Sequence, residues 1–314
     1  MIIGNRTFDF DNNFYMMGIL NVTPDSFSDG GKYDDMDSAL RQAEKLIADG
    51  ADIIDVGGES TRPDHIKITE EQEIERVCPV IEKLKDRFDV PVSLDTYKAE
   101  VAAAGIDAGA DLINDIWGLK WDRVCDKTYE QSMAEVIAKA GLPCCLMHNR
   151  DKVYIGGDSQ EYRDTLDSWS DKGSLHNTGS VQVDNPFGYN NYIEDVIADI
   201  QESIEIALEA GIMKDNIMID PGIGFAKDLQ QNLILMNHLD ELCKLRYPVL
   251  LGTSRKSMIG LTLDLPVGER EEGTIATSVL GYQAGCRIFR VHDVKANLRA
   301  LRMTEAITKA GRLS

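Results

Sequence analysis

Short apolar runs alternate along this chain with longer segments in which apolar residues recur every three or four positions. The short runs are rich in Ile, Val and Leu, which is typical of strands that are buried on both faces. Most of them end abruptly in Asp, Asn or another polar residue. Eight such runs occur, at residues 16–20, 52–56, 90–94, 112–113, 143–147, 217–219, 248–251 and 288–289.

The segments between these runs have the spacing of amphipathic helices, and several end at a glycine. They cover residues 38–49, 70–88, 98–107, 131–140, 192–210, 229–245, 273–284 and 294–309. Strands that alternate with helices predict a parallel sheet. Eight such units favour an α/β fold, a single (β/α)8 TIM barrel over residues 1–314. A doubly wound sheet is disfavoured, because the glycine pattern of dinucleotide-binding turns is absent after the first strand.

One connection is much longer than a barrel requires. Residues 149–190, after the fifth strand, are dominated by Gly, Ser, Asp, Asn and Tyr. Loops longer than about 15 residues are usually functional or disordered. We interpret this insertion as a partly ordered flap over the mouth of the barrel, with disorder as the alternative. A shorter insertion at residues 120–129 is expected to pack against it.

The chain of 314 residues is acidic, with a formal net charge of −20 and a pI near 4.6. Nucleic acid and anionic membranes are therefore disfavoured as partners, because both require a basic surface, whereas an anionic small molecule needs only a local group of cations. The six cysteines include no CxxC pair, which indicates reduced thiols and a cytoplasmic protein. Neither an 18-residue apolar span nor a signal-peptide pattern is visible.

In a TIM barrel the residues that follow the strands converge at one end, where active sites are built. Asp95, Asn114 and Asp220 offer acceptors that suit a heterocycle rich in N–H donors, and cations beside them suit phosphate or carboxylate. We therefore predict an enzyme whose site pairs such a ring with an anion. HExxH and P-loop motifs are absent, so zincin hydrolysis and P-loop phosphoryl transfer have no support. The predicted mouth residues are Asn21, Thr61, Arg62, Asp95, Asn114, His148, Asp220, Lys256, Arg290 and His292.

Eight motifs at the predicted strand ends occur in the order found in the dihydropteroate synthase family, which the chain resembles over nearly its whole length. They are GILNVTPDSFSDGG (18–31), DVGGESTRP (55–63), SLDTYK (93–98), LINDI (112–116), MH (147–148), IDPGIGFAK (219–227), GTSRKS (252–257) and RVHD (290–293). The resemblance implies a transferase of folate biosynthesis that condenses para-aminobenzoate with 6-hydroxymethyl-7,8-dihydropterin diphosphate, giving 7,8-dihydropteroate and pyrophosphate. It also implies a homodimer and inhibition by sulfonamides, which imitate para-aminobenzoate.

The family pattern implies a role for each matching residue. Asn21, Arg290 and His292 would bind the pyrophosphate, with Asn21 as the ligand of a Mg²⁺ cofactor that stabilises the leaving charge. The pterin ring would be bound by Asp95, Asn114, Asp220 and Lys256. Of these four, Asp95, Asp220 and Lys256 would also be catalytic. The para-aminobenzoate pocket would consist of Thr61, Arg62, Pro63, Phe225 and Ser254. A mobile first loop would carry Asp25, Phe27 and Asp29.

Other interpretations stay open. A corrinoid-linked methyltetrahydrofolate methyltransferase shares the pterin-binding barrel, and a non-catalytic pterin-binding paralogue would keep the ring contacts but lose the pyrophosphate clamp. Taken singly, Asp95 and Asn114 are also ordinary caps of the helices that follow them. Arg290 alone fits a salt bridge at the rim, and Phe225 alone fits the core. His148 follows a core strand, where a buried, hydrogen-bonded histidine is common, so it is left out of the functional assignments.

Overall fold

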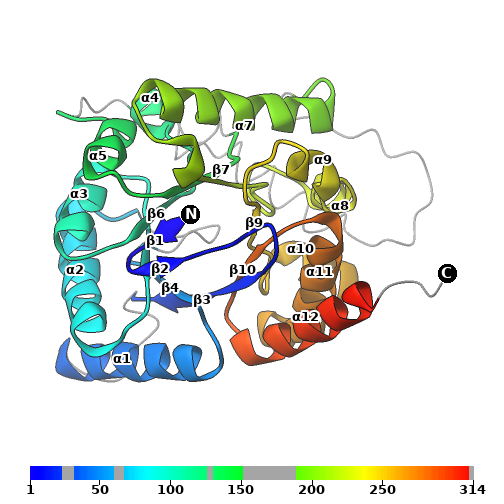
Figure 1. The fold of residues 1–314 in the computed structure, drawn as a ribbon, viewed down its shortest axis with the longest axis horizontal. Coiled ribbons are helices and arrows are strands. Elements are labelled where there is room, and N and C mark those ends of the chain that lie inside the picture. The colour runs from blue at the N-terminus through cyan, green and yellow to red at the C-terminus, as the bar shows by residue number, and fades with distance from the viewer. Residues whose placement is uncertain (23–31, 60–66, 126–129, 151–188, 311–314) are drawn as a thin grey trace.

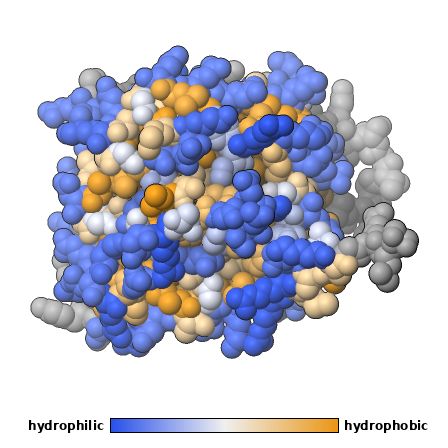
Figure 2. All heavy atoms as spheres, viewed as in Figure 1, coloured by the Kyte–Doolittle hydropathy of each residue, from blue (hydrophilic) through white to orange (hydrophobic). Residues whose placement is uncertain are grey.

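The structure, a computed structural model, has a central barrel of strands surrounded by helices (Figure 1). It describes residues 1–22, 32–59, 67–125, 130–150 and 189–310. None of the helices within these ranges has the length and apolar character needed to cross a membrane. The face shown in Figure 2 carries hydrophilic residues over most of its area and apolar residues in scattered groups.

Eight parallel strands form one sheet with the strand order β8-β7-β6-β5-β4-β3-β10-β9. Ile219 in β8 forms a parallel bridge to Val249, directly before β9, so the two edge strands meet and the sheet closes. The predicted α/β barrel is therefore confirmed. The strands are β3 (Tyr15–Asn21), β4 (Ile53–Gly57), β5 (Val92–Asp95), β6 (Leu112–Asp115), β7 (Cys144–Met147), β8 (Ile217–Asp220), β9 (Leu250–Leu251) and β10 (Ile288–Val291).

The helices follow the predicted alternation, with differences at their ends and one break. Two short helices, Trp121–Val124 and Ser257–Leu263, were not predicted. The predicted helix 229–245 is wrong in its continuity, because His238 has a non-helical backbone (φ −122°, ψ 22°) between two shorter helices. The predicted helix 131–140 begins at Met133, since Ser132 caps it and forms a capping box with Glu135. The helices are α1 (Lys32–Ala48), α2 (Glu70–Arg87), α3 (Ala99–Asp107), α4 (Trp121–Val124), α5 (Met133–Ala140), α7 (Tyr192–Glu209), α8 (Leu229–Asn237), α9 (Leu239–Cys243), α10 (Ser257–Leu263), α11 (Glu271–Ala284) and α12 (Val294–Lys309), with 3-10 turns at Lys214–Asn216 and Val267–Glu269.

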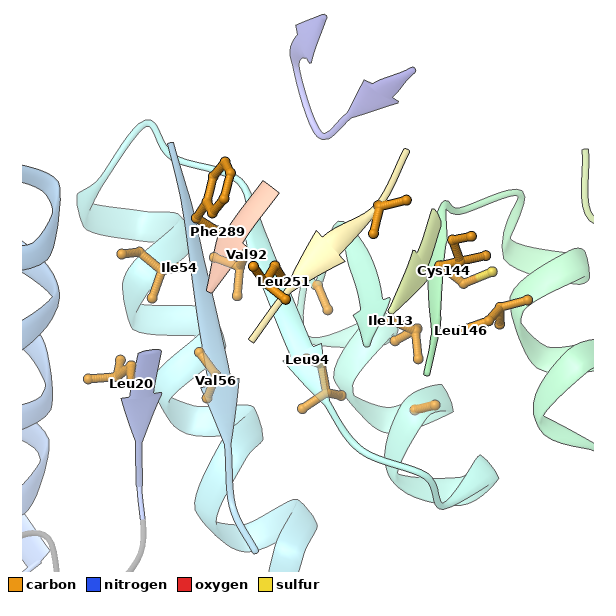
Figure 3. Packing of buried hydrophobic residues seen from close by; sticks show 14 of the residues in the cluster. Leu20, Ile54, Val56, Val92, Leu94, Ile113, Cys144, Leu146, Leu251 and Phe289 are labelled. Carbon is orange, nitrogen blue, oxygen red and sulfur yellow. The ribbon is translucent and has the colours of Figure 1, made fainter. Parts of the chain in front are cut away.

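The two faces of each strand explain how the barrel positions its polar residues. Successive side chains point alternately into and out of the barrel. In β4, Ile54 and Val56 belong to the apolar cluster between the sheet and the helices, whereas Ile53 and Asp55 belong to the interior. Figure 3 shows members of the outer cluster from several strands, including Leu20, Ile54, Val56, Val92, Leu94, Ile113 and Leu146. Every second residue of a strand is thus available to fill or equip the barrel interior.

A hairpin that the sequence analysis did not predict closes the N-terminal end of the barrel. Strands β1 (Ile2–Ile3) and β2 (Arg6–Thr7) pair antiparallel and lie across the middle of the barrel in Figure 1. Side chains of this segment pack against inward-facing residues of seven barrel strands. We call this group the base cluster, and it consists of Ile3, Phe8, Met17, Ile53, Leu112, Cys145, Met218, Leu250 and Ile288. The polar interior residues therefore lie toward the opposite, C-terminal end of the strands.

The long insertion follows the fifth barrel strand, as predicted. Strand β7 ends at Met147, and the next described helix, α7, begins at Tyr192. The predicted flap lies largely outside the described residues, as does its predicted packing against residues 120–129. The described start of the shorter insertion contacts α7, since Lys120 Nζ donates to the Asp199 carbonyl at 2.8 Å.

Candidate active site

Polar residues lie together at the C-terminal ends of neighbouring strands. Asp95 at the end of β5 pairs in register with Asn114 on β6 and with Gly57 on β4. Gly57 also pairs with Asn21 on β3. A Cβ atom on Gly57 would lie 3.6 Å from Asp95 Cβ and 3.8 Å from Asn21 Oδ1. These predicted pterin- and pyrophosphate-binding residues therefore share one small region, to which Gly57 adds no side chain.

Arg290 on β10 binds two carboxylates of this region. Its Nε donates to Asp55 Oδ2 at 2.6 Å, and its Nη2 donates to Asp95 Oδ2 at 2.5 Å. Asp55 also accepts from Ser93 Oγ at 2.5 Å and from Asn114 Nδ2 at 3.4 Å. Hydrogen bonds between charged groups are short and strong. Asp55 thus fixes Arg290 and Asn114 relative to Asp95.

Asp55 is a site residue that the sequence analysis missed. It lies in the middle of β4, is fully buried, and is surrounded by Ile and Val in the sequence. A buried acidic residue within a strand requires a cationic or hydrogen-bonding partner, and Arg290 is that partner. The available signal was the spacing: Asp55 stands two residues after Ile53 and two before Gly57, so all three face the barrel interior.

Burial governs the protonation of the carboxylates. It raises the pKa of Asp95 to about 7, with Arg290 opposing the rise and Asp55 adding to it. Burial also raises the pKa of Asp220, against the effect of Lys256. Burial acts to lower the pKa of Arg290, but Asp55 and Asp95 outweigh it and raise that pKa above its ordinary value. The site therefore holds a permanent cation beside carboxyl groups that are harder to ionise than usual.

The loop after β8 brings a carboxylate, an aromatic ring and an amine together. Asp220 Oδ1 accepts from the Gly222 N–H at 2.6 Å, and Gly222 has the positive φ (67°) that this turn requires. Lys256, the residue before α10, donates to the Ile223 carbonyl, and its Nζ lies 4.7 Å from the centroid of the Phe225 ring. Burial lowers the pKa of Lys256 to about 8, against the effect of Asp220. The amine is thus a donor placed at the face of an aromatic ring.

Gly252, directly after β9, lies close to both Asp220 on β8 and Arg290 on β10. A Cβ atom on Gly252 would lie 3.7 Å from Asp220 Oδ2 and 3.9 Å from Arg290 Cβ. Because glycine has no side chain, Asp220 and Arg290 face a common space there. The structure therefore brings together the predicted site residues that it describes, namely Asn21, Asp95, Asn114, Asp220, Phe225, Ser254, Lys256, Arg290 and His292.

Ser254 and His292 follow the neighbouring strands β9 and β10 and bind each other. Ser254 Oγ lies 2.9 Å from His292 Nδ1 and accepts from the His292 backbone N–H at 3.2 Å. The adjacent Arg255 forms a bidentate ion pair with Asp293, its Nη2 lying 2.8 Å from both carboxylate oxygens. A residue predicted for para-aminobenzoate therefore adjoins one predicted for pyrophosphate. Six further predicted residues lie outside the described ones: Asp25, Phe27, Asp29, Thr61, Arg62 and Pro63.

The fold and these side chains define a (β/α)8-barrel enzyme with acceptors and cations at the C-terminal end of its strands. Comparison with protein families matches residues 17–292 to the pterin binding enzymes. The chain belongs to the pterin-binding enzyme family and, within it, to the dihydropteroate synthases, which are transferases.

Relatives and solved structures of this family match almost the whole chain. The dihydropteroate synthase of Clostridium beijerinckii is 50% identical over 310 residues, which are 98% of this chain and 100% of that protein. That of Bacillus subtilis is 47% identical, over 94% and 89% of the two chains. The Clostridium difficile enzyme, solved in the presence of pteroic acid, is 43% identical with a TM-score of 0.80, covering 96% and 99%. The Yersinia pestis enzyme in complex with a sulfonamide drug is 39% identical with a TM-score of 0.78, covering 99% of each chain. The Xanthomonas albilineans enzyme with 4-aminobenzoic acid is 36% identical with a TM-score of 0.79, covering 97% and 96%.

Proposed function

We propose that the chain condenses para-aminobenzoate with 6-hydroxymethyl-7,8-dihydropterin diphosphate, giving 7,8-dihydropteroate and pyrophosphate for folate synthesis. The observation that carries this proposal is a group of side chains in which hydrogen-bond acceptors adjoin cations. The acceptors are Asp95, Asn114 and Asp220, and the cations are Arg290 and Lys256. Such a group suits one ligand that has both a donor-rich ring and a diphosphate. Identity to dihydropteroate synthases over nearly the full chain supports it.

The pterin ring would bind to the carboxylates at the ends of β5 and β8. The N–H groups of its aminopyrimidinone edge match Asp95 and Asp220 as acceptors. Asn114 would offer its amide oxygen, because its Nδ2 already points toward Asp55. Lys256, placed at the face of the Phe225 ring, would donate to the N5 and O4 side of the pterin. We infer that these contacts fix the ring with its methylene carbon toward Arg290.

Arg290 and His292 would bind the pyrophosphate. Arg290 now divides its donors between Asp55 and Asp95. We infer that the bond to Asp95 yields to substrate, because a diphosphate competes for one edge of the guanidinium while Asp55 retains the other. Asp95 is then released to accept from the pterin.

Asn21 would be the protein ligand of Mg²⁺. Its Oδ1 lies in the same region as Asp95, close to Gly57. Mg²⁺ usually keeps several waters and takes one or two protein oxygens together with substrate phosphates, so a single amide oxygen fits. Within the described ranges, no group of three or more His, Cys, Asp or Glu side chains is placed to hold a metal ion. When bound, the ion supplies positive charge to the diphosphate oxygens.

Para-aminobenzoate would bind beside Phe225 and Ser254. Thr61, Arg62 and Pro63 are assigned to the same pocket by family resemblance. Solved relatives with 4-aminobenzoic acid and with a sulfonamide drug support a pocket of this kind. We therefore expect sulfonamides to compete with para-aminobenzoate for this chain.

The reaction would break the bond between the methylene carbon and the diphosphate oxygen, with both electrons leaving on the pyrophosphate. The amine nitrogen of para-aminobenzoate then attacks the pterin cation, forms the new C–N bond and loses a proton. Arg290 and His292 would stabilise the leaving charge, and the carboxylates of Asp95 and Asp220 would stabilise the cation. Groups already fixed by the protein are effective here because they need not reorganise during the reaction.

A homodimer formed through the outer helices α10, α11 and α12 is also proposed. Exposed apolar patches commonly mark protein interfaces. The exposed apolar side chains on these helices are Leu261, Leu263, Leu280, Met303 and Ile307, each 39–64% exposed. Sedimentation of the purified protein tests the dimer.

A cytoplasmic location is proposed from the six cysteines, all of which are free thiols.

The central test is pyrophosphate release from the dihydropterin diphosphate and Mg²⁺, measured with and without para-aminobenzoate. Release that depends on para-aminobenzoate and yields dihydropteroate is the expected result. A chelator should suppress it, and added Mg²⁺ should restore it. Pterin binding without release would instead favour a non-catalytic paralogue or a methyltetrahydrofolate-binding methyltransferase.

A further inference from the structure

The β8–α8 loop, residues 221–228, is held by a lysine to which the proposed reaction gives no role. Lys227 is buried, and its Nζ donates to the Gly222 carbonyl at 3.0 Å and to the Phe225 carbonyl at 2.9 Å. Its third contact is His148 Nδ1 at 2.7 Å. An ammonium group has three N–H donors and no acceptor. Burial lowers the pKa of Lys227, with Asp220 opposing the effect, but three acceptors around Nζ favour the ammonium form. In that form the geometry uses every donor of Lys227.

His148 is fixed in the orientation that this contact requires. The ring is buried, and its Nε2 lies 3.2 Å from Asp199 Oδ2 on α7. Because the carboxylate accepts, Nε2 carries the proton and Nδ1 remains the acceptor for Lys227. Burial lowers the pKa of His148 to about 3, with Lys227 adding to the effect, which agrees with a neutral ring. Arg150 Nε holds the same carboxylate at 3.1 Å.

The loop that Lys227 holds makes three contacts within the candidate active site. Asp220, directly before the loop, accepts from the Gly222 N–H. The loop carries the Phe225 ring, and its Ile223 carbonyl accepts from Lys256. The shape of this short segment thus sets the positions of a carboxylate, an aromatic ring and an amine.

The loop has no free space on the side of Lys227. A Cβ atom on Gly222 would lie 1.9 Å from the His148 carbonyl oxygen and 3.3 Å from Lys227 Nζ. The backbone N–H of His148 donates to the Asp220 carbonyl at 2.9 Å, so β7 and β8 are joined at the same level. On its other side, the Gly224 N–H donates to Asn232 Oδ1 at 2.6 Å. The loop is therefore clamped between α8 and the Lys227–His148 pair.

We propose that Lys227 is a positioning residue for the pterin site, holding the β8–α8 loop in the shape that presents Asp220 and Phe225 to the ligand. The identity of that ligand rests on the proposed function. Lys227 acts through the loop and does not itself touch the substrate. Its loss would leave the Phe225 carbonyl and the His148 imidazole nitrogen without a donor, and the Gly222 carbonyl with only the Phe225 N–H at 3.0 Å. The loop would then relax away from its present shape.

The test compares Lys227→Met with Lys85→Met. Lys85 is a control away from the site: it is a more exposed lysine whose Nζ pairs with Asp111 Oδ2 at 2.7 Å, at the N-terminal end of the barrel. The Kd of the dihydropterin diphosphate is measured by calorimetry without para-aminobenzoate, and kcat and KM are measured with it. We expect Lys227→Met to weaken pterin binding at least about tenfold and to lower kcat, because small displacements of site groups have large effects. Lys85→Met is expected to change the Kd by less than about twofold.

Thermal unfolding of both variants separates positioning from stability. A lower Tm for Lys227→Met, with Kd, KM and kcat of the folded protein unchanged, would overturn the proposal. Should this variant not fold, Asp199→Leu removes the acceptor that fixes the tautomer of His148, and about threefold weaker pterin binding is expected. An unchanged Kd in Asp199→Leu would equally overturn it. Wild-type protein that neither binds the pterin nor releases pyrophosphate would refute the proposed function as well, whereas normal wild-type turnover with unaffected variants refutes only the role of Lys227.

Discussion

The two ends of the barrel differ in the inward-facing residues that its strands carry: these are apolar at the N-terminal end and polar or charged toward the C-terminal end. In the base cluster, Ile53 and its neighbours are apolar and need no specific partner. Two residues further along β4, Asp55 is equally buried but is held by Arg290 and Ser93. Burial of an apolar side chain stabilises a fold by about 1.5–3 kcal/mol, whereas a buried charge is unfavourable unless it is paired. The base cluster therefore stabilises the fold, whereas the charged residues at the opposite end contribute to ligand binding and catalysis rather than to stability.

Removal of the central cation should have the largest effect. Arg290→Ala is expected to lower kcat/KM about 10³-fold, equivalent to about 4 kcal/mol, because the leaving pyrophosphate loses its fixed donor. The fold should persist, since the base cluster is untouched and the two freed carboxyl groups can become protonated. Lys256→Ala is expected to abolish most turnover in the same way. Steady-state pyrophosphate release and thermal unfolding measure both effects, and turnover like that of the wild type would contradict the assigned roles.

A substitution in the base cluster should lower the stability of the fold and leave the kinetic constants unchanged, the opposite of what is expected for Arg290→Ala. Ile53→Ala is expected to lower the free energy of unfolding by about 3 kcal/mol, because it leaves a cavity in a packed layer. The folded variant should keep its kcat and KM. Urea unfolding and kinetics at low temperature measure the two quantities. Ile2→Ala is the control, since Ile2 is exposed in the hairpin that covers the base cluster and its replacement should change stability by less than about 0.5 kcal/mol. A large loss of kcat/KM in Ile53→Ala would show that the two ends are not separable.

Asp55→Asn tests a site residue that follows directly after the base cluster along the inward face of β4. It keeps the shape of the side chain but removes the charge that holds Arg290, so kcat/KM is expected to fall about 30-fold, or about 2 kcal/mol. Its free energy of unfolding should change less than that of Ile53→Ala. Ser93→Ala removes a single hydrogen bond to the same carboxylate and should have a smaller kinetic effect. Equal losses in the two variants would mean that the charge of Asp55 is unimportant.

The sequence predicted the residues at strand ends well because their positions follow from local pattern. An apolar strand of known period identifies its last inward residue, so the pattern alone assigns Asp95, Asn114 and Asp220 to one end of a barrel. Long, periodic segments likewise predicted the helices. The break at His238 could not be predicted, since neither glycine nor proline marks it.

Residues whose roles depend on distant partners were missed. Asp55 and Arg290 are 235 positions apart, so nothing near Asp55 in the sequence indicates its ion pair. Lys227 and His148 are 79 positions apart and adjoin only because β7 and β8 are neighbours. The closing hairpin has strands of two residues each, too short for any periodicity to appear.

The smallest predicted effect is the dependence of kcat/KM on pH. It should arise from titratable residues at the C-terminal end of the strands, and substitutions in the base cluster should not alter it. Asp95 must be ionised to accept from the pterin, and burial raises its pKa to about 7, so kcat/KM should rise as the pH increases through that value. Lys256 must be protonated to donate, and burial lowers its pKa to about 8, so kcat/KM should fall as the pH increases further. The expected profile is a narrow bell between these two limits.

Lys256→Arg distinguishes the acid limb of the pH profile, assigned to Asp95, from the alkaline limb, assigned to Lys256. A guanidinium keeps a donor near the Phe225 ring and stays protonated throughout the range, so the variant should be less active but should lose the alkaline limb while retaining the acid one. Half a pH unit above the Lys256 pKa, the wild-type kcat/KM should already be reduced about 2.5-fold from its maximum, whereas that of the variant should not be reduced. Ile53→Ala should retain both limbs. If the alkaline limb persists in Lys256→Arg, another group titrates there, and the reduced wild-type rate cannot be assigned to deprotonation of this amine.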